Sequence, residues 1–432
     1  MRRATLLLLF AVAAQAATER EVRAALEART GSVTLPAGVI EIASEIVLPE
    51  GVRDLAISGD AAGTTLRAAA GFRGRAILVA RKARGLRVSA LAFDGNRAAL
   101  EVRAGLPAYD TPFARFTANN GILVEEGEGV AIENASFSSI SGFAVLVARS
   151  TGVRIRKVNV TGSGSRNAAG RNNTTGGILF EEGSGDFQAT DCVFRRIRGN
   201  GVWTHSLYTS PRNRDGLIAR NRFEEIGRDA IQVGHATRVR VEENTGRRIG
   251  FPADVVDTEG GGTPVAIDTA GNVDLGVYAR NRFDQISGKC IDLDGFHHGE
   301  VLGNTCVSGD FGIVMNNTNP DMQSEHIVVK DNEMRGMKYG GIFVIGTDHV
   351  IEGNRLLDLN TAHCDDCAHF PGEPALLRSG IYLGQRAERP AVARRNVIRG
   401  NTITGYKMNL RCLGAAPGVI LKENRLENNL CQ

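Results

Sequence analysis

The stretches of sequence that decide the fold are Ala266-Ile267-Asp268-Thr269, Cys290-Ile291-Asp292-Leu293 and Gly312-Ile313-Val314-Met315. In each stretch a small or sulfur-bearing residue precedes an apolar residue, which we call the anchor. The anchors Ile267, Ile291 and Ile313 lie 24 and 22 residues apart. That spacing is the length of one coil that carries two or three short strands and turns. It predicts a stacked solenoid rather than a chain of separate globular domains.

The same unit recurs along most of the chain. Further anchors are Ile122, Ile178, Val202, Ile231, Ile342 and Ile381. Successive residues of a strand face opposite sides. We therefore expect the anchors to form one inward column, with Ile231, Ile267, Ile291 and Ile313 at its centre, and the residue after each anchor to point outward.

A second repeated unit places an Asn, and once an Asp, at the end of a short β-branched strand. Stacked coils bring such residues into register, so we predict a ladder of side-chain amides along one turn. Its predicted members are Asn134, Asn159, Asp191, Asn221, Asn244, Asn281, Asn304, Asn332, Asn354, Asn401 and Asn424.

The N-terminal segment has the pattern of an export signal. Arg2 and Arg3 precede the apolar residues 4–14, and Ala14-Gln15-Ala16 is typical of a cleavage site. We expect residues 1–16 to be a signal peptide and the mature chain to be secreted, extracellular or periplasmic. No other long apolar run occurs, so we expect no membrane span, and the net charge of +3 argues against nucleic acid as a partner.

Residues 17–31 are predicted to form an N-terminal capping α-helix, and residues 32–432 the solenoid with its loop insertions. Thr18 and Glu21 have the spacing of a capping box, and Gly31 ends the pattern. A cap is needed because a bare sheet edge would otherwise pair with other chains.

The capping segment, followed by residues 33–38 (VTLPAG) and Phe93-Asp94-Gly95-Asn96, resembles the entry segment of the pectin-lyase-like superfamily. The repeats extend the resemblance from about Ser32 to Asn428. It implies an all-β fold, a single right-handed parallel β-helix. The superfamily includes polygalacturonases, pectate and other polysaccharide lyases, uronan epimerases and phage tailspikes, so the resemblance implies a polysaccharide partner.

The chain has seven cysteines. Cys412 and Cys431 are placed to join the last coil, whereas Cys192, Cys290 and Cys306 lie in strand patterns and are expected to be buried free thiols. Cys364 and Cys367 lie between His363 and His369 in one loop. That loop has the residues of a zinc site, but a disulfide or a bare loop is the preferred interpretation in an exported protein.

The outward positions suggest a catalytic site. Asp268 and Asp292 follow the anchors of adjacent coils, and Asp294 lies two residues along the second strand. Carboxyl groups so close cannot all ionise freely, so one pKa should be raised, and we expect Asp292 to be that acid. A solvated polar column and a Ca²⁺ site are the alternatives.

Other outward residues in the same coils are candidate substrate-binding residues. We expect Trp203 either to stack against a sugar ring or to be covered by the loop of residues 206–216, and Lys289 to lie beside the acids. The remaining candidates are His205, Gln232, His297, His298 and Asn316. Insertions on both edges of the anchor column are expected to wall a groove: Thr161–Gly176, Ser206–Gly216, Gly250–Thr263, Asn317–Glu325 and Leu359–Ser379.

These features favour a glycoside hydrolase that uses Asp268, Asp292 and Asp294 and needs no cofactor or metal. Two alternatives stay open. One is a lyase or epimerase acting on a uronate, with Ca²⁺ held by the acids and Lys289 or an arginine as base. The other is a β-helix that binds glycan without cleaving it.

Overall fold

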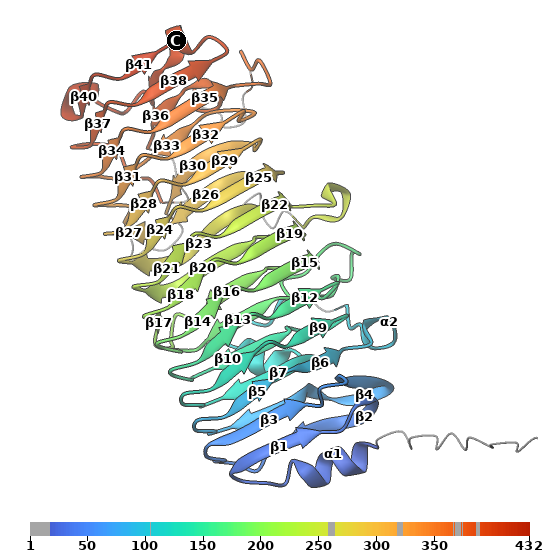
Figure 1. Cartoon of the computed structure of the whole chain (residues 1–432). Coiled ribbons are helices and arrows are strands. Elements are labelled where there is room, and N and C mark those ends of the chain that lie inside the picture. Colours follow the sequence, from blue (N-terminus) through green and yellow to red (C-terminus); the bar gives the residue numbers. More distant parts are fainter. Residues whose placement is uncertain are drawn as a thin grey trace, which may run out of the picture.

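The computed structural model shows a long stack of coils that runs from a short helix at the N-terminal end to the C-terminus (Figure 1). It describes residues 18–103, 105–257, 264–317, 323–365, 367, 373, 375–385 and 389–432; the predicted signal peptide lies outside them. Helix α1 (Glu19–Ala25) begins with the predicted capping box of Thr18 and Glu21. Val22 and Leu26 are buried against the first coil. None of the helices in the described ranges is long and apolar enough to cross a membrane.

The strands of the described residues form two parallel sheets, of 14 and 27 strands, and the larger sheet divides after β4 (Thr64–Arg81) into two branches. We call these the back sheet and, for the two branches, the anchor sheet and the side sheet. The anchor sheet carries the anchor residues and begins with β2 (Gly38–Val47) and β4. Its later strands are β7 (Asn120–Glu125), β10 (Val145–Ala148), β13 (Ile178–Glu181), β16 (Val202–His205), β20 (Ile231–Thr237), β23 (Val265–Asp274), β26 (Lys289–Asp294), β30 (Phe311–Asn316), β33 (Ile342–Val344), β36 (Ile381–Leu383) and β39 (Leu413–Ala415).

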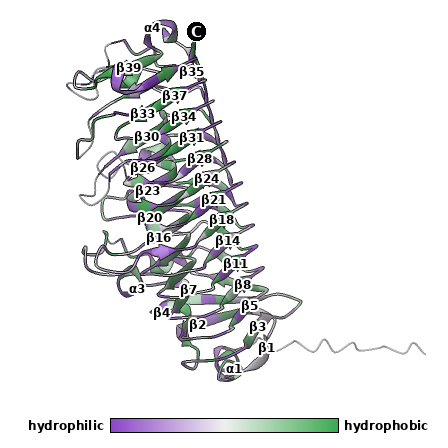
Figure 2. Cartoon of the chain, turned by 90° about the vertical axis from the view of Figure 1, so that its left-hand side faces the viewer, coloured by the Kyte–Doolittle hydropathy of each residue, from purple (hydrophilic) through white to green (hydrophobic). Residues whose placement is uncertain are grey.

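The back sheet lies on the opposite side of the stack, and Figure 2 shows its strands as a column separate from the anchor sheet. Its strands are β1 (Gly31–Leu35), β3 (Leu55–Gly59), β5 (Arg87–Ser89), β8 (Ala131–Glu133), β11 (Arg154–Arg156), β14 (Gln188–Thr190), β18 (Leu217–Ala219), β21 (Arg240–Glu242), β24 (Val277–Ala279), β28 (Glu300–Leu302), β31 (Val328–Lys330), β34 (Val350–Glu352), β37 (Val397–Arg399) and β40 (Arg425–Glu427).

The side sheet follows the back sheet in every coil and also starts on β2 and β4. Its strands are β6 (Leu91–Asp94), β9 (Ser136–Ser138), β12 (Asn159–Thr161), β15 (Val193–Ile197), β19 (Arg222–Ile226), β22 (Thr245–Ile249), β25 (Arg282–Ile286), β29 (Thr305–Val307), β32 (Glu333–Arg335), β35 (Arg355–Leu359), β38 (Thr402–Gly405) and β41 (Leu430–Cys431). Two short strands, β17 (Asn213–Arg214) and β27 (Phe296–His297), pair with the C-terminal ends of β20 and β23.

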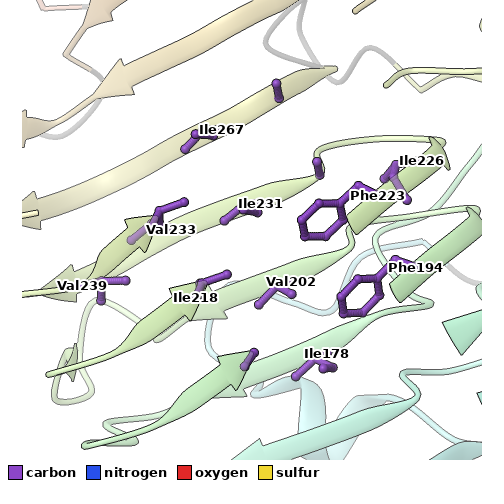
Figure 3. Packing of buried hydrophobic residues seen from close by; sticks show 14 of the residues in the cluster. Ile178, Phe194, Val202, Ile218, Phe223, Ile226, Ile231, Val233, Val239 and Ile267 are labelled. Carbon is purple, nitrogen blue, oxygen red and sulfur yellow. The ribbon is translucent and has the colours of Figure 1, made fainter. Parts of the chain in front are cut away.

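The predicted anchor column is confirmed. Register pairs Ile231 with Ile267, Ile267 with Ile291, and Ile291 with Ile313, and all four are fully buried. Figure 3 shows Ile178, Val202, Ile231 and Ile267 on successive strands of this column. Phe194 and Phe223 form a second interior stack with ring centroids 5.0 Å apart. Their burial supplies the apolar area that holds the coils together.

The amide ladder exists, but it is shorter than predicted. From Asn221 to Asn429, each side chain donates its Nδ2 to the Oδ1 of the next at 2.8–3.0 Å. Its members are Asn221, Asn244, Asn281, Asn304, Asn332, Asn354, Asn401 and Asn429. The side chains up to Asn401 are almost fully buried.

Four predicted members of the ladder lie elsewhere. Asn134 and Asp191 occupy the preceding turn residue, with φ of 50° and 58°. Asn and Asp tolerate this left-handed backbone, which explains the one-residue error in register. Asn159 is an exposed residue of β12. Asn424 accepts hydrogen bonds from Asn396 in a second, shorter ladder.

Three disulfides occur among the described cysteines. Cys412–Cys431 joins the last coil as predicted, and Cys364 is bonded to Cys367. The prediction for Cys290 and Cys306 was wrong, because these two side chains meet across the coil interior and form a disulfide. Cys192 is a buried free thiol, as expected. His369 of the predicted zinc loop lies outside the described residues.

A segment that the repeat analysis missed covers the N-terminal part of the anchor sheet. It spans residues 97–119, contains α2 (Arg97–Leu100) and α3 (Phe113–Phe116), and is called the cover segment below. Phe113 and Ala114 pack on the outward residues Leu123, Leu146 and Leu179. Figure 2 shows α3 on the outer side of the anchor sheet. The other short helices are α4 (Met408–Arg411), η1 (Ala253–Val255), η3 (Leu376–Arg378) and η4 (Leu421–Glu423).

Candidate active site

Three polar residues occupy one outward position on successive strands of the anchor sheet. Register pairs Gln232 on β20 with Asp268 on β23, and Asp268 with Asp292 on β26. Adjacent strands lie about 4.8 Å apart, so the two Asp residues are immediate neighbours along the stack. Asp294 lies further along β26 and is paired with Asn316 on β30. The structure thus brings together the acids that the sequence singled out.

A relay of amide hydrogen bonds ends on Asp268. Asn200, just before β16, donates its Nδ2 to Oε1 of Gln232 at 2.7 Å. Gln232 in turn donates its Nε2 to Oδ2 of Asp268 at 2.8 Å. The amide of Gln232 therefore fixes the orientation of the Asp268 carboxyl group.

The acids are far less open than the sequence suggested. The exposed fractions of Asp268 and Asp292 are 6% and 4%. The expectation that they lie on the floor of an open groove was therefore wrong. Strand alternation predicts which way a side chain points, but it does not predict what covers that side chain. Lys289, Asp294, Val314 and Asn316 are half-buried, so the column becomes more open towards β30.

Burial raises the pKa of Asp268 well above its ordinary value, and the carboxylates of Asp229 and Asp292 raise it further. Asp229 is fully buried in the turn before β20, where its Oδ1 accepts a hydrogen bond from the Val265 amide at 2.8 Å. The positive charge of Lys289 acts in the opposite direction. The surroundings therefore favour a protonated Asp268.

Asp292 has a different partner. The Nζ of Lys289 forms an ion pair with its Oδ2. Burial alone would lower the pKa of Lys289, but the charge and the hydrogen bond of Asp292 outweigh burial and raise it. Oδ1 of Asp292 is buried and has no hydrogen-bond partner among the described residues. We expected Asp292 to be the acid with the raised pKa, but the structure gives that property to Asp268.

Trp203 points outward, as predicted, but it is enclosed. Its ring centroid lies 4.8 Å from that of Phe113 and 6.3 Å from that of Phe143, and only 7% of the residue is exposed. The cover segment supplies Phe113, whereas the sequence had suggested the 206–216 loop as a possible cover. These contacts give Trp203 a packing role, and we no longer assign it to sugar stacking.

His205 belongs to the same aromatic cluster. Its ring lies 5.3 Å from Phe113 and 5.2 Å from Trp203. Burial lowers its pKa to about 4, so it is neutral at neutral pH. Its ligating atoms lie close to those of Glu181 and Glu182. Those two carboxylates accept hydrogen bonds from loop backbone amides, which indicates a structural role.

His297 ends β27 and His298 follows it. Both lie at the edge of the anchor sheet, beyond the column of acids. Their Nδ1 atoms are 3.0 Å apart, and with Glu325 they form a group of ligand atoms close enough to hold a metal ion. Burial lowers the pKa of His297. We predicted both histidines as substrate-binding residues; the structure places them together, after the acids along the chain.

Comparison with known proteins supports the fold. Residues 114–270 match a family model described as a right handed beta helix region. No curated protein matches the sequence significantly. The chain has the fold of a right-handed parallel β-helix.

Solved structures of similar β-helices come from proteins with different activities. The catalytic unit of a thermostable GH87 alpha-1,3-glucanase from Streptomyces thermodiastaticus strain HF3-3 is 12% identical, with a TM-score of 0.56 over 89% of this chain and 65% of the other. DFA-IIIase from Arthrobacter chlorophenolicus A6, in complex with GF2, is 13% identical, with a TM-score of 0.52 over 95% and 92%. The Streptococcus pneumoniae surface protein and adhesin PfbA is 13% identical, with a TM-score of 0.50 over 95% and 94%.

Two polar residues of this β-helix site escaped the sequence analysis. Asn200 and Asp229 precede the anchor strands β16 and β20, where the repeat has no fixed polar position. Asn200 follows Gly199, and Asp229 follows Arg228. Such residue pairs are also common in ordinary solvent-exposed turns. Only the coil stacking shows that both are buried beside Gln232 and Asp268.

Proposed function

We propose that the chain is a glycoside hydrolase that cleaves a polysaccharide at Asp268 and Asp292. The observation that carries the proposal is the pair itself: two buried carboxyl groups one strand apart, one with a raised pKa and the other ion-paired with Lys289. Glycoside hydrolysis needs one protonated acid and one ionised carboxylate on either side of the scissile bond.

In this proposal, Asp268 donates its proton to the glycosidic oxygen, and the leaving sugar departs as an alcohol. Asp292 attacks the anomeric carbon and forms a glycosyl ester. Asp268, now ionised, takes a proton from a water molecule whose oxygen displaces Asp292. A separation of about one strand spacing, roughly 5 Å, matches the close carboxyl pair of retaining enzymes rather than the wider pair of inverting enzymes.

Hydrolysis is supported more strongly than a lyase reaction based on Lys289. A general base must be able to lose its proton, but the pKa of Lys289 is raised by its ion pair with Asp292. Two β-helices of similar fold are named as a glucanase and a DFA-IIIase, whereas a third is an adhesin. We further propose that the chain is exported, with polysaccharide as its partner.

The test is a screen of the purified protein against neutral and acidic polysaccharides, with products read as reducing ends and as absorbance in the ultraviolet. Asp268→Asn and Asp292→Asn should each lower the rate by roughly 10²–10⁴-fold, the usual contribution of an acid–base group. Asp284→Asn, a half-buried residue of the side sheet, is the matched control and should keep full activity.

Two results would contradict the proposal. An unsaturated product that disappears in chelator would indicate a Ca²⁺-dependent lyase. Saccharide binding without turnover of any member of the panel would indicate a binding protein.

Proton NMR of the first product should show retention of the anomeric configuration.

A further inference from the structure

An arginine-lined cavity lies beside the turn that joins the side sheet to the anchor sheet. Its volume is about 470 Å³. Four arginines reach it from three separate parts of the chain: Arg97 from the cover segment, Arg166 from the loop after β12, and Arg196 and Arg198 from the end of β15.

The carboxylates around the cavity are already paired. Arg198 contacts Oε1 of Glu101 at 2.6 Å, and Glu225 on the cavity wall contacts Arg248 at 3.2 Å. Across the described residues, no ion pair joins Arg97, Arg166 or Arg196 to a carboxylate. An arginine side chain stays protonated in proteins, so the cavity is lined by three positive charges that have no ion pair of their own among the described residues.

The arginines also affect one another. Arg97 donates to the carbonyl oxygen of Gly162, which holds its guanidinium group at the cavity. Burial lowers its pKa, the charges of Arg198 and Arg166 lower it further, and the carboxylate of Glu101 opposes them. Nε of Arg166 is buried and has no hydrogen-bond partner among the described residues. Arg97, Arg166 and Arg198 are half-buried and Arg196 is exposed. Like charges held close together and a buried donor without a partner cost stability unless an anion offsets them.

The rest of the wall suits a sugar. Ser138, Ser139, Thr161 and Asn172 offer hydroxyl and amide groups, and Phe251 offers an aromatic ring. Guanidinium groups bind planar or tetrahedral oxyanions through paired hydrogen bonds. We infer that this cavity is a subsite for an anionic substituent of the glycan, a carboxylate or a sulfate ester, so that the substrate class is an acidic polysaccharide.

The position of the cavity fits a subsite of the proposed enzyme, on whose function this inference rests. Glu225 on its wall and Asp229 beside the acids belong to the same coil. Arg198 precedes β16, and Asp268 and Asp292 lie two and three strands further along the stack. At about 4.8 Å per step, the axial separation is about 10–14 Å, which a short oligosaccharide spans.

The test is calorimetric titration of the full chain with oligosaccharides from polygalacturonate, carrageenan and dextran. The pocket variant carries Arg166→Gln and Arg196→Gln. The matched control carries Arg355→Gln and Arg399→Gln, two exposed arginines of distant strands with the same change of charge. Circular dichroism and melting temperatures verify that both variants fold.

At least one acidic oligosaccharide should bind more tightly than dextran. The pocket variant should lose roughly tenfold or more of that affinity, as expected for hydrogen bonds to a charged group, while the control keeps it. If only polygalacturonate binds, the cavity recognises a carboxylate. If only carrageenan binds, it recognises a sulfate ester. If both bind, it recognises negative charge without selecting the group that carries it.

The inference is overturned if neither acidic oligosaccharide binds better than dextran, or if the pocket variant binds as tightly as the control. Failure of the proposed function is distinguishable, because Asp268→Asn should stop cleavage and leave this binding intact. Binding that depends on the arginines, in a protein that cleaves nothing, would keep the subsite and reject the hydrolase.

Discussion

Asp268 and Asp292 have the same functional group one strand apart, yet their neighbours differ. Asp268 accepts an amide hydrogen bond and has acidic neighbours, whereas Asp292 has the ammonium group of Lys289. The sequence predicted the pair because both follow an anchor. It could not assign the roles, because these depend on Asp229 and Lys289, whose positions become clear only when the coils are stacked.

The raised pKa of Asp268 has a consequence for stability. The folded state holds the proton more tightly than the unfolded state, so this contribution to stability is full below the ordinary Asp pKa and is lost as pH rises through the raised value. The Asp268→Asn variant has no carboxyl group to ionise at this position, so it avoids this loss of stability at high pH. The variant should melt close to the native protein at pH 4 and above it at pH 7.

Thermal melting across this pH range checks the prediction. Asp284→Asn, on the side sheet, is the control and should show no comparable rise relative to the native protein. A constant difference between Asp268→Asn and the native protein at every pH would mean that the carboxyl group of Asp268 ionises normally.

Trp203 is the only tryptophan, and its role also belongs to the residue scale. Because its ring packs against Phe113 and Phe143, Trp203→Ala should lower the free energy of unfolding by about 3–5 kcal/mol. Denaturant unfolding measures this loss. A well-folded Trp203→Ala protein of native stability but weaker saccharide affinity would restore the sugar-stacking role.

At the scale of elements, the cover segment is the main departure from the sequence-based prediction. Residues 97–119 contain no anchor and no ladder residue, so repeat analysis passes over them. They are held by Glu181 on β13, whose carboxylate accepts hydrogen bonds from the amides of Phe113 at 2.9 Å and Ala114 at 2.7 Å. One buried side chain thus fixes the start of α3 above the sheet.

Glu181→Ala should release the cover segment and expose Trp203 to water. The tryptophan emission should shift to longer wavelength, with little change in the circular dichroism of the strands. Glu182→Ala is the matched control, because Glu182 bonds instead to Leu207 and Ser210 in the neighbouring loop. An unchanged emission for Glu181→Ala would show that apolar packing alone holds the cover segment.

For the whole molecule, periodicity was sufficient to predict the stack, the inward column and most of the ladder. It failed where two positions accept the same residue types, as at Asn134 and Asp191, and where distant side chains meet, as at Cys290 and Cys306. Repeat spacing fixes which residues share a column. It carries no information about contacts across the interior of a coil.

The ladder predicts unequal effects of one substitution. Asn304 bonds to Asn281 and Asn332 and donates to the Tyr278 carbonyl, so Asn304→Ala leaves several buried groups unpaired. We expect a loss of roughly 2–5 kcal/mol. Asn429→Ala, at the partly exposed end, should cost about 1 kcal/mol. Equal shifts in denaturant unfolding would contradict a cooperative ladder.

The ladder also divides the chain into interchangeable parts. Asn281 and Asn304 lie 23 residues apart, and each meets its neighbours through the same bonds. A tandem duplication of such a segment would therefore join the stack with both of its faces already matched. Proteins of this design can grow in length by copying one coil. The distance between an acid and its partner on the next coil then stays constant, whereas the distance from that acid to each end of the stack changes.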